Sequence, residues 1–197
     1  ENLFKLKNKD KIKYREKYLL PKTKNIYLVP FKIKFLDKTM FEIFKKILDK
    51  DNNSLLLLLS PKKIELKRSY YKIMEEIFQD KINNIQFLEP LKSQNNSKQN
   101  RKKHFLELVC ASDVILDIEN TQFEVIFNVL SVGKCIITLP NNSLRSRITF
   151  GIYKKMGILD LIAQNEKDFV EKAFLIADTI DIRNEMESKI CQKRNSC

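Results

Sequence analysis

The stretch ASDVILDIENTQFEVIFNVLSVGKCIITLP, residues 111–140, contains a strand, a helix and a second strand in succession. One apolar run, residues 114–116, ends at Asp117, and a second, residues 135–139, ends at Pro140. Between them, residues 123–132 place apolar side chains at helical spacing. Short continuous apolar runs are typical of parallel strands that are covered on both faces. The stretch therefore predicts one β–α–β unit of a parallel sheet.

The same alternation precedes this unit. A β-rich run at residues 26–29 closes at Pro30, and Thr39 with Glu42 three residues later forms a capping box that predicts the start of a helix. Residues 55–59 are five consecutive leucines, which predict a parallel strand with every side chain buried. A third strand is expected at residues 85–88. The helix before it is expected to bury an apolar side made of Ile64, Tyr70, Tyr71, Ile73, Met74, Ile77 and Phe78.

The chain after residue 140 continues the alternation. Residues 146–156 read as a helix, residues 159–163 as a short apolar piece, and Asn165 with Asp168 three residues later as the cap of a further helix. One more helix is expected to close the chain. Repeated alternation of strand and helix predicts an α/β fold, a doubly wound, Rossmann-like parallel sheet.

Two segments depart from this pattern. Residues 1–24 alternate Lys with polar residues, and we expect a basic linker or the end of a preceding lobe there. Residues 92–103 are rich in Asn and Lys and hold almost no apolar side chain, which predicts an exposed loop insertion. The folded lobe is accordingly expected to span residues 25–197.

Composition excludes several classes of protein. With 43% apolar residues in 197, the chain can bury a core, and its longest clean apolar run, residues 55–59, is too short for a membrane span, so we expect no membrane partner. Residues 1–24 lack the apolar core of a signal peptide, and a cytoplasmic or nucleocytoplasmic location is expected, for a whole chain or a piece of one. The four cysteines show no metal-binding spacing, which favours reduced, buried thiols and no metal site.

The net charge of +12 raises nucleic acid as a partner. Abundant Lys, Asn, Ile and Phe beside 3 Gly and no Trp are also what an AT-biased coding sequence produces, and no stripe of Arg interleaves with aromatic residues. A nucleic-acid partner is therefore unlikely, and a basic nucleic-acid-associated module stays as an alternative.

In a parallel sheet of this kind, ligands bind beyond the carboxyl ends of the strands. A phosphate-binding loop usually needs glycines there, but the three glycines of this chain, Gly133, Gly151 and Gly157, lie elsewhere. There is no GxGxxG, GxxxxGK or GxSxG motif. The dinucleotide-binding and P-loop classes are excluded on that ground.

Residues 111–117 and 128–140 resemble the end of the catalytic domain of glycosyltransferase family 41. This family includes the O-linked N-acetylglucosamine (O-GlcNAc) transferases and the SPINDLY-type O-fucosyltransferases. Its typical wording is "ADVxLD", "DALWxGVPVVTLPG", "SR" and "LGxxELIA", and this chain continues with Ser146, Arg147 and the run KMGILDLIA at residues 155–163. The likeness is strong over residues 111–178 and fainter over residues 15–91, where Arg15 fits the usual lead-in.

The resemblance implies the C-terminal, donor-binding lobe of a two-lobed GT-B glycosyltransferase. Such a lobe holds a nucleotide sugar, UDP-N-acetylglucosamine or GDP-fucose, without a metal or other cofactor, for transfer to Ser or Thr of an acceptor protein. The N-terminal catalytic lobe and helical tetratricopeptide repeats are then expected before residue 1. No catalytic residue can be assigned within this chain.

The resemblance also implies candidate nucleotide-sugar-binding residues. They are Asn128 at the position of a ribose-contacting Asp, Lys34 beside the position of a diphosphate-contacting Lys, His104 one residue from a uracil-side His, Asn120 and Thr121 in the phosphate loop, and Arg147 in the "SR" pair. Each has a structural alternative: a helix-surface amide for Asn128, a solvated cation for Lys34, a capping or surface residue for His104, and for Arg147 a contact that fixes a helix N-terminus to the sheet.

The phosphate loop departs from the family pattern. Where the family places two threonines on the donor diphosphate, this chain has Glu124 and Val125, and the loop is about one residue shorter. A carboxylate repels phosphate and a valine side chain donates no hydrogen bond. A catalytically eroded pseudoenzyme or scaffold of the same fold is therefore the alternative to a working transferase.

Overall fold

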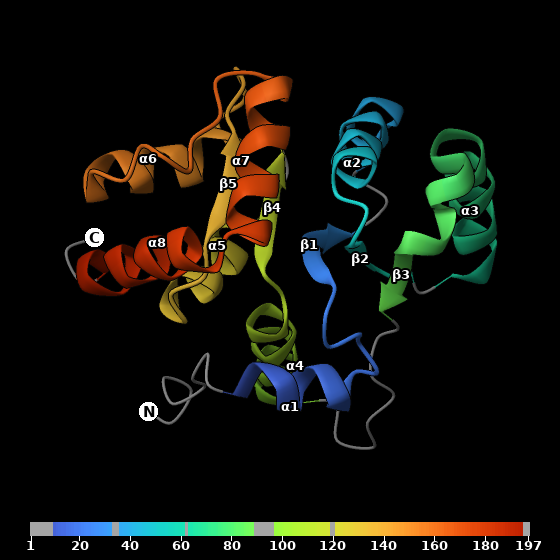
Figure 1. Ribbon diagram of the computed structural model, residues 1–197. Coiled ribbons are helices and arrows are strands. Elements are labelled where there is room, and N and C mark those ends of the chain that lie inside the picture. The colour runs from blue at the N-terminus through green and yellow to red at the C-terminus, as the bar shows by residue number, and fades with distance from the viewer. Residues whose placement is uncertain (1–9, 33–35, 62, 89–96, 119–120, 195–197) are drawn as a thin grey trace.

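The computed structural model describes residues 10–32, 36–61, 63–88, 97–118 and 121–194. Its elements (Figure 1) are, in chain order, α1 (Lys11–Lys17), β1 (Asn25–Lys32), α2 (Lys38–Lys50), β2 (Ser54–Leu59), α3 (Ile64–Phe78), the 3-10 helix η4 (Gln79–Asn84), β3 (Ile85–Leu88), α4 (Lys98–Ala111), β4 (Val114–Ile118), α5 (Phe123–Ser131), β5 (Ile136–Leu139), α6 (Arg147–Met156), α7 (Glu166–Asp178) and α8 (Ile180–Lys193). The five strands form one parallel sheet in the order β3-β2-β1-β4-β5. The predicted doubly wound α/β fold is confirmed.

The strand order fixes the layers. From β1 the chain adds β2 and β3 on one side of the sheet and later adds β4 and β5 on the other. Right-handed crossovers then place α2 and α3 on one face, and the helices that lead into β4 and β5 on the opposite face. Helix α7 contacts β1, β4 and β5 and lies beside α2, in front of the sheet in Figure 1.

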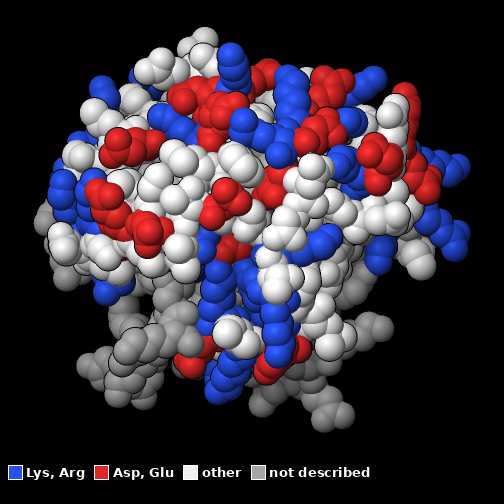
Figure 2. Space-filling view, viewed as in Figure 1, with Lys and Arg blue, Asp and Glu red and all other residues white. Residues whose placement is uncertain are grey.

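Ion pairs join the neighbouring helices α2 and α7. Lys46 and Glu166 lie 3.0 Å apart, and Lys50 and Glu171 lie 2.9 Å apart. Figure 2 shows basic and acidic side chains intermixed over much of this face. Helix α1, low in the same view, carries the exposed Lys13 and Lys17. Lys46 and Lys50 of α2 thus pair with acids of α7, which differs from a continuous basic stripe that tracks a nucleic-acid backbone.

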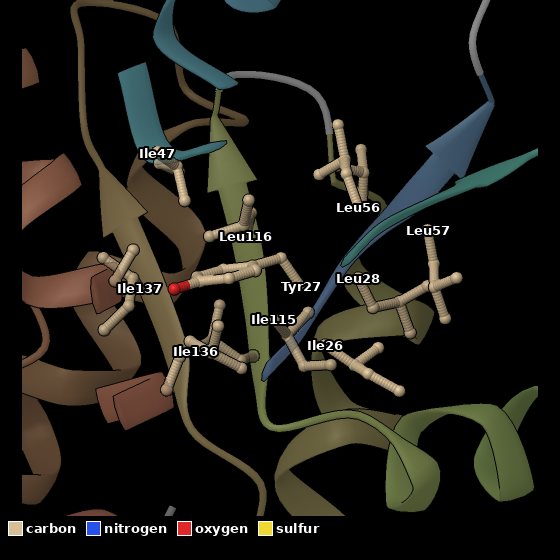
Figure 3. Packing of buried hydrophobic residues seen from close by; sticks show 14 of the residues in the cluster. Ile26, Tyr27, Leu28, Ile47, Leu56, Leu57, Ile115, Leu116, Ile136 and Ile137 are labelled. Carbon is tan, nitrogen blue, oxygen red and sulfur yellow. The ribbon is translucent and has the colours of Figure 1, made fainter. Parts of the chain in front are cut away.

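The core lies on both faces of β1, β2 and β4 (Figure 3). Tyr27 and Leu28 of β1 pair with Leu56 and Leu57 of β2, and all four side chains are buried. The leucine run is a parallel strand between two others, as predicted, and residues 55–58 are buried. Leu59 is only partly buried, so the prediction that every side chain is covered is wrong at the last position.

Three local predictions are corrected. Helix α2 is capped by Asp37, whose carboxylate accepts a hydrogen bond from Met40 N at 2.9 Å, and not by Thr39, which lies within the first turn. An anionic cap is favourable because its negative charge also interacts with the positive end of the helix dipole.

On α3, Ile64, Tyr71 and Ile73 are exposed, and the buried residues are Met74, Ile77 and Phe78. Of the cysteines, Cys110 and Cys135 are buried as expected, whereas Cys191 is exposed.

The expected loop over residues 92–103 is wrong for residues 98–103, which form the first turns of α4. Ser97 caps this helix by accepting a hydrogen bond from Asn100 N at 3.2 Å. These turns carry polar side chains because they face solvent for the most part, so no apolar stripe marks them in the sequence. Residues 89–96 lie outside the described part of the chain.

The expected basic linker over residues 1–24 is wrong for residues 11–24. Helix α1 lies against α4, and Tyr14, Arg15 and Leu20 are buried. Residues 1–9 lie outside the described residues, and the alternative expectation, the end of a preceding lobe, stays a prediction.

Arg15 and Asp113 fix α1 to the amino edge of the sheet. The Arg15 guanidinium lies 2.6 Å from Asp113 Oδ2 and donates to the carbonyls of Ala111 at 2.9 Å and Lys22 at 2.7 Å. Asp113 Oδ2 also accepts from Ile26 N at 2.8 Å, which links the starts of β4 and β1. Burial alone would raise the pKa of Asp113, but the cations of Lys11, Arg15 and Arg183 lower it.

Candidate donor site at the carboxyl edge of the sheet

The strand order places a topological switch point between β1 and β4. Chain connections run outward from these two strands in opposite directions, and in open parallel sheets ligands bind at the carboxyl edge where this happens. The loop after β1 contains Lys34, and the loop after β4 contains Asn120 and Thr121. Three candidate residues from distant parts of the sequence thus follow the two strands that border the switch point. Lys34 and Asn120 themselves lie outside the described residues.

Asp117 is the central polar residue of this edge. It is 1% exposed near the end of β4, and its Oδ2 accepts hydrogen bonds from Thr138 Oγ1 of β5 at 3.1 Å and Thr149 Oγ1 of α6 at 2.5 Å. Burial raises the pKa of the Asp117 carboxyl, and the hydroxyls of Thr121, Thr149 and Thr138 oppose that rise only in part. The carboxyl group thus ties three elements together beneath the loop.

Thr121 is the described candidate closest to Asp117. It is 2% exposed and precedes α5, whose first turn also holds the exposed acid Glu124. A helix N-terminus attracts anions through its free N–H groups, and an acid in the first turn occupies that positive end itself. The observed helix start therefore weakens the case for tight binding of a diphosphate.

The loop from β5 to α6 is held by its own side chains. Ser146, which is buried, donates from its hydroxyl to Asn141 Oδ1 at 2.6 Å, and Asn141 N donates back to Ser146 Oγ at 3.0 Å. Arg147 begins α6, is exposed, and lies over the Phe150 ring at 5.7 Å. The alternative in which Arg147 fixes the helix to the sheet finds no support in these contacts, and the guanidinium faces solvent at the start of the helix.

Asn128 and His104 belong to the helices α5 and α4. Asn128 is half-buried in the second turn of α5, and its backbone carbonyl accepts a hydrogen bond from Ser131 Oγ at 2.7 Å. His104 belongs to α4 and lies against α1, with Nδ1 at 3.0 Å from Tyr18 Oη and 3.4 Å from Glu107 Oε2. Figure 1 places α4 below the start of β4, beside α1. The structure thus gives His104 a set of structural partners.

Sequence reasoning missed two features of the site. The first is the pair Thr138 and Thr149, whose hydroxyls donate to Asp117 from elements far from it in the chain. The sequence showed only that a carboxylate, Asp117, follows the apolar run at residues 114–116. Phe123 and Phe127 of α5 are 58% and 40% exposed, and their ring centroids lie 4.3 Å apart.

No grouping of His, Cys, Asp and Glu within the described ranges has the arrangement of a metal site. In the same part of the chain, no helix is both long enough and apolar enough to cross a bilayer.

One comparison with known proteins identifies a family. The family model of glycosyl transferase family 41 matches residues 5–197. No curated protein matches the chain.

Solved structures share the fold at low sequence identity. A mutant of the Thermobaculum terrenum O-GlcNAc transferase superposes with a TM-score of 0.73 at 13% identity, over 87% of this chain and 32% of that one. WaaG, a glycosyltransferase involved in lipopolysaccharide biosynthesis, superposes with a TM-score of 0.63 at 14% identity, over 95% of this chain and 47% of that one. The chain therefore spans less than half the length of either protein, and it has the fold of one lobe of such an enzyme.

Proposed function

The chain belongs to glycosyl transferase family 41, and on that premise we propose that it is the donor-binding lobe of a protein O-glycosyltransferase. The donor is a nucleoside-diphosphate sugar that carries N-acetylglucosamine or fucose, and the acceptor is Ser or Thr of a protein. The observation that carries the proposal is the switch point between β1 and β4, because the family match covers both strands and the loops that follow them.

The lobe's contribution to the reaction is electrostatic. When the sugar leaves, negative charge develops on the nucleoside diphosphate, and fixed donors and cations around that group lower the barrier. In this proposal Lys34 and Arg147 supply the cations, Asn120 and Thr121 supply polar contacts in the loop after β4, and Asn128 meets the ribose. His104 is left out because its ring is engaged with α1. No metal takes part in this scheme.

Glu124 favours a second candidate function, a lobe that keeps the fold and has lost most donor affinity. It is exposed in the first turn of α5, where the resemblance to the family predicts a threonine on the diphosphate. Two charge-assisted hydrogen bonds are worth about 3 to 6 kcal/mol, enough to turn a micromolar site into a millimolar one. Wild-type protein is therefore expected to bind UDP or GDP with a dissociation constant near the millimolar range.

Calorimetric titration of UDP and GDP into wild type and Glu124→Thr tests both candidates. The substitution removes a repulsive charge and adds a hydroxyl donor, together worth about 2 to 4 kcal/mol. Since each 1.4 kcal/mol is a factor of ten, the affinity should rise roughly 30-fold or more.

Arg147→Ala serves as the second variant and Arg68→Ala, an exposed residue of α3, as its matched control. Loss of one exposed cation should weaken nucleotide binding about two- to fivefold, and the control should leave it unchanged. Low-micromolar binding by the wild type would favour a working transferase over an eroded one. Undetectable binding by both wild type and Glu124→Thr at millimolar nucleotide would contradict the donor-site proposal.

A further inference from the structure

Two buried polar atoms at the carboxyl edge have no hydrogen-bond partner within the described residues. They are Asp117 Oδ1 and Thr121 Oγ1. Asp117 Oδ2, by contrast, already accepts two hydroxyls, from Thr138 and Thr149. Thr121 follows Asp117 by four residues, and its hydroxyl is among the groups that act on the pKa of Asp117. Unsatisfied buried atoms are rare in proteins, so two that lie this close in the chain call for one explanation.

The surroundings of Asp117 offer hydroxyls and no compensating cation. On α6 the groups toward the sheet are Thr149 and Tyr153, whose buried hydroxyl accepts from Ile136 N at 3.0 Å. On β5 the group is the hydroxyl of Thr138. Across β1, the Tyr27 hydroxyl donates to Asp51 instead.

The helices that pack nearby add no cation either. The buried side of α5 consists of Ile126, Val129 and Leu130, and Glu124 on that helix is exposed. The buried side of α7 is apolar, while its acids Glu166 and Glu171 pair with lysines of α2. Among the described residues, Asp117 thus has no ion-pair partner, and an isolated buried charge is costly.

We propose that Asp117 is a neutral carboxylic acid whose Oδ1–H donates a hydrogen bond to Thr121 Oγ1 and so links β4 to Thr121. One proton satisfies both unpartnered atoms, and Oδ2 continues to accept from Thr138 and Thr149. The group then connects β4 with β5, α6 and the residue that precedes α5. Burial, which raises the pKa of this carboxyl, acts in the same direction.

The protonated state also affects the ligand that the edge can accept. An ionised carboxyl beneath the loop after β4 would repel a diphosphate, whereas a neutral acid does not. This consequence rests on the proposed donor site. The protonation state of Asp117 and its hydrogen bond to Thr121 are independent of the donor site, so both are tested without nucleotide.

The first test compares the unfolding equilibrium of wild type and Asp117→Asn between pH 5 and 7. Asparagine has the same shape, accepts both threonine hydroxyls through its oxygen and donates to Thr121 through its amide. A folded-state pKa above the unfolded value of about 3.9 gives stability that is present at low pH and is lost as the pH rises toward the folded-state pKa. The unfolding constant of the wild type relative to Asp117→Asn should therefore rise with pH, by up to about tenfold per pH unit, until the folded-state pKa is reached.

Asp113→Asn is the matched control, because Asp113 is also buried and directly precedes the same strand but has three cationic partners. Its folded-state pKa is lowered, so it is ionised in both folded and unfolded chains above pH 5, and the ratio to wild type should be flat there. A flat ratio for Asp117→Asn as well would overturn the proposal.

The second test observes the proton directly and does not depend on the variants being stable. In wild type labelled with 13C at the aspartate carboxyl carbons, one buried resonance should stay in the protonated position to higher pH than the resonances of the exposed aspartates, and it should be absent from the Asp117→Asn spectrum. Thr121→Val removes the acceptor, so the titration midpoint of this resonance should fall. A midpoint that rises would mean that Thr121 donates to a carboxylate, and a wild-type resonance that titrates with the exposed aspartates would refute the neutral acid.

Discussion

Arg15→Met tests whether α1 is an integral part of the lobe. The Arg15 side chain is 3% exposed and donates to Asp113 and to the carbonyls of Ala111, Pro21, Lys22 and Lys24. Methionine keeps the apolar stem and removes all of these bonds. Breaking a buried ion pair by deleting one partner costs about 3 to 5 kcal/mol. Because Lys11 and Arg183 still face Asp113, we expect the lower end, about 3 kcal/mol.

Urea denaturation followed by far-UV circular dichroism measures this loss. With a denaturant slope of about 2 kcal/mol/M, the midpoint should fall by about 1.5 M at unchanged slope. The melting temperature should fall by roughly 6 to 12 °C. Arg68→Met, an exposed position on α3, is the control and should stay within about 0.5 kcal/mol of wild type. A loss under about 1 kcal/mol for Arg15→Met would refute the assignment of α1 as a fixed element.

Two further substitutions test the packing of the lobe by thermal unfolding. Leu57→Ala, at a fully buried position in β2, should cost about 2 to 5 kcal/mol, and Leu59→Ala, which is partly exposed in the same strand, about 1 kcal/mol; equal losses would contradict the burial pattern. Gly133 has φ +77° and an added Cβ would lie 2.3 Å from Cys191 Sγ. Gly133→Ala should therefore cost about 2 to 4 kcal/mol, and adding Cys191→Ala should recover the steric part and leave the backbone strain; complete recovery would show that strain contributes nothing.

The sheet could be predicted from the sequence because its strands are buried on both faces. Runs such as residues 114–116 and 135–139 hold apolar residues without interruption, and the structure places strands there with ends that differ by one or two residues. The cap of α7 by Asn165 was also visible, since it depends on two residues three positions apart, and Asp168 N donates to Asn165 Oδ1 at 2.9 Å. Both patterns depend only on residues that are close together in the chain, so they can be read from the sequence without knowing the tertiary contacts.

Helix α1 could not be predicted because its fixation is not local. Arg15 stands among lysines in the sequence, and what distinguishes it is Asp113, a partner 98 residues away. The first turns of α4 failed for a related reason. Their side chains face solvent, and a polar helix has the same composition as a polar loop until a cap such as Ser97 is recognised.

The candidate site shows the same limit more sharply. The resemblance to the family named positions in loops, and the strand order brought the loops after β1 and β4 to one switch point. It could not identify Thr138 and Thr149, because a threonine that donates to a buried acid has the same sequence context as one that fills a core. The polar layer beneath a ligand loop is built from pairs across elements, and spacing along the chain does not encode it.

The two buried acids near β4 lie at opposite edges of the sheet, so stability and nucleotide binding should depend on different residues. Asp113, before the first residue of β4, meets three cations at the amino edge and secures α1 and α8. Asp117, four residues later, meets hydroxyls at the carboxyl edge and secures the start of the ligand loop. The buried charged groups are concentrated at the amino edge, away from the loops that would bind the ligand. Arg15→Met should therefore lower stability without changing the nucleotide affinity of the folded protein. Arg147→Ala should weaken nucleotide binding without lowering stability. If the two effects moved together, the edges would be coupled through β4, and the lobe could not lose donor affinity while it kept its fold.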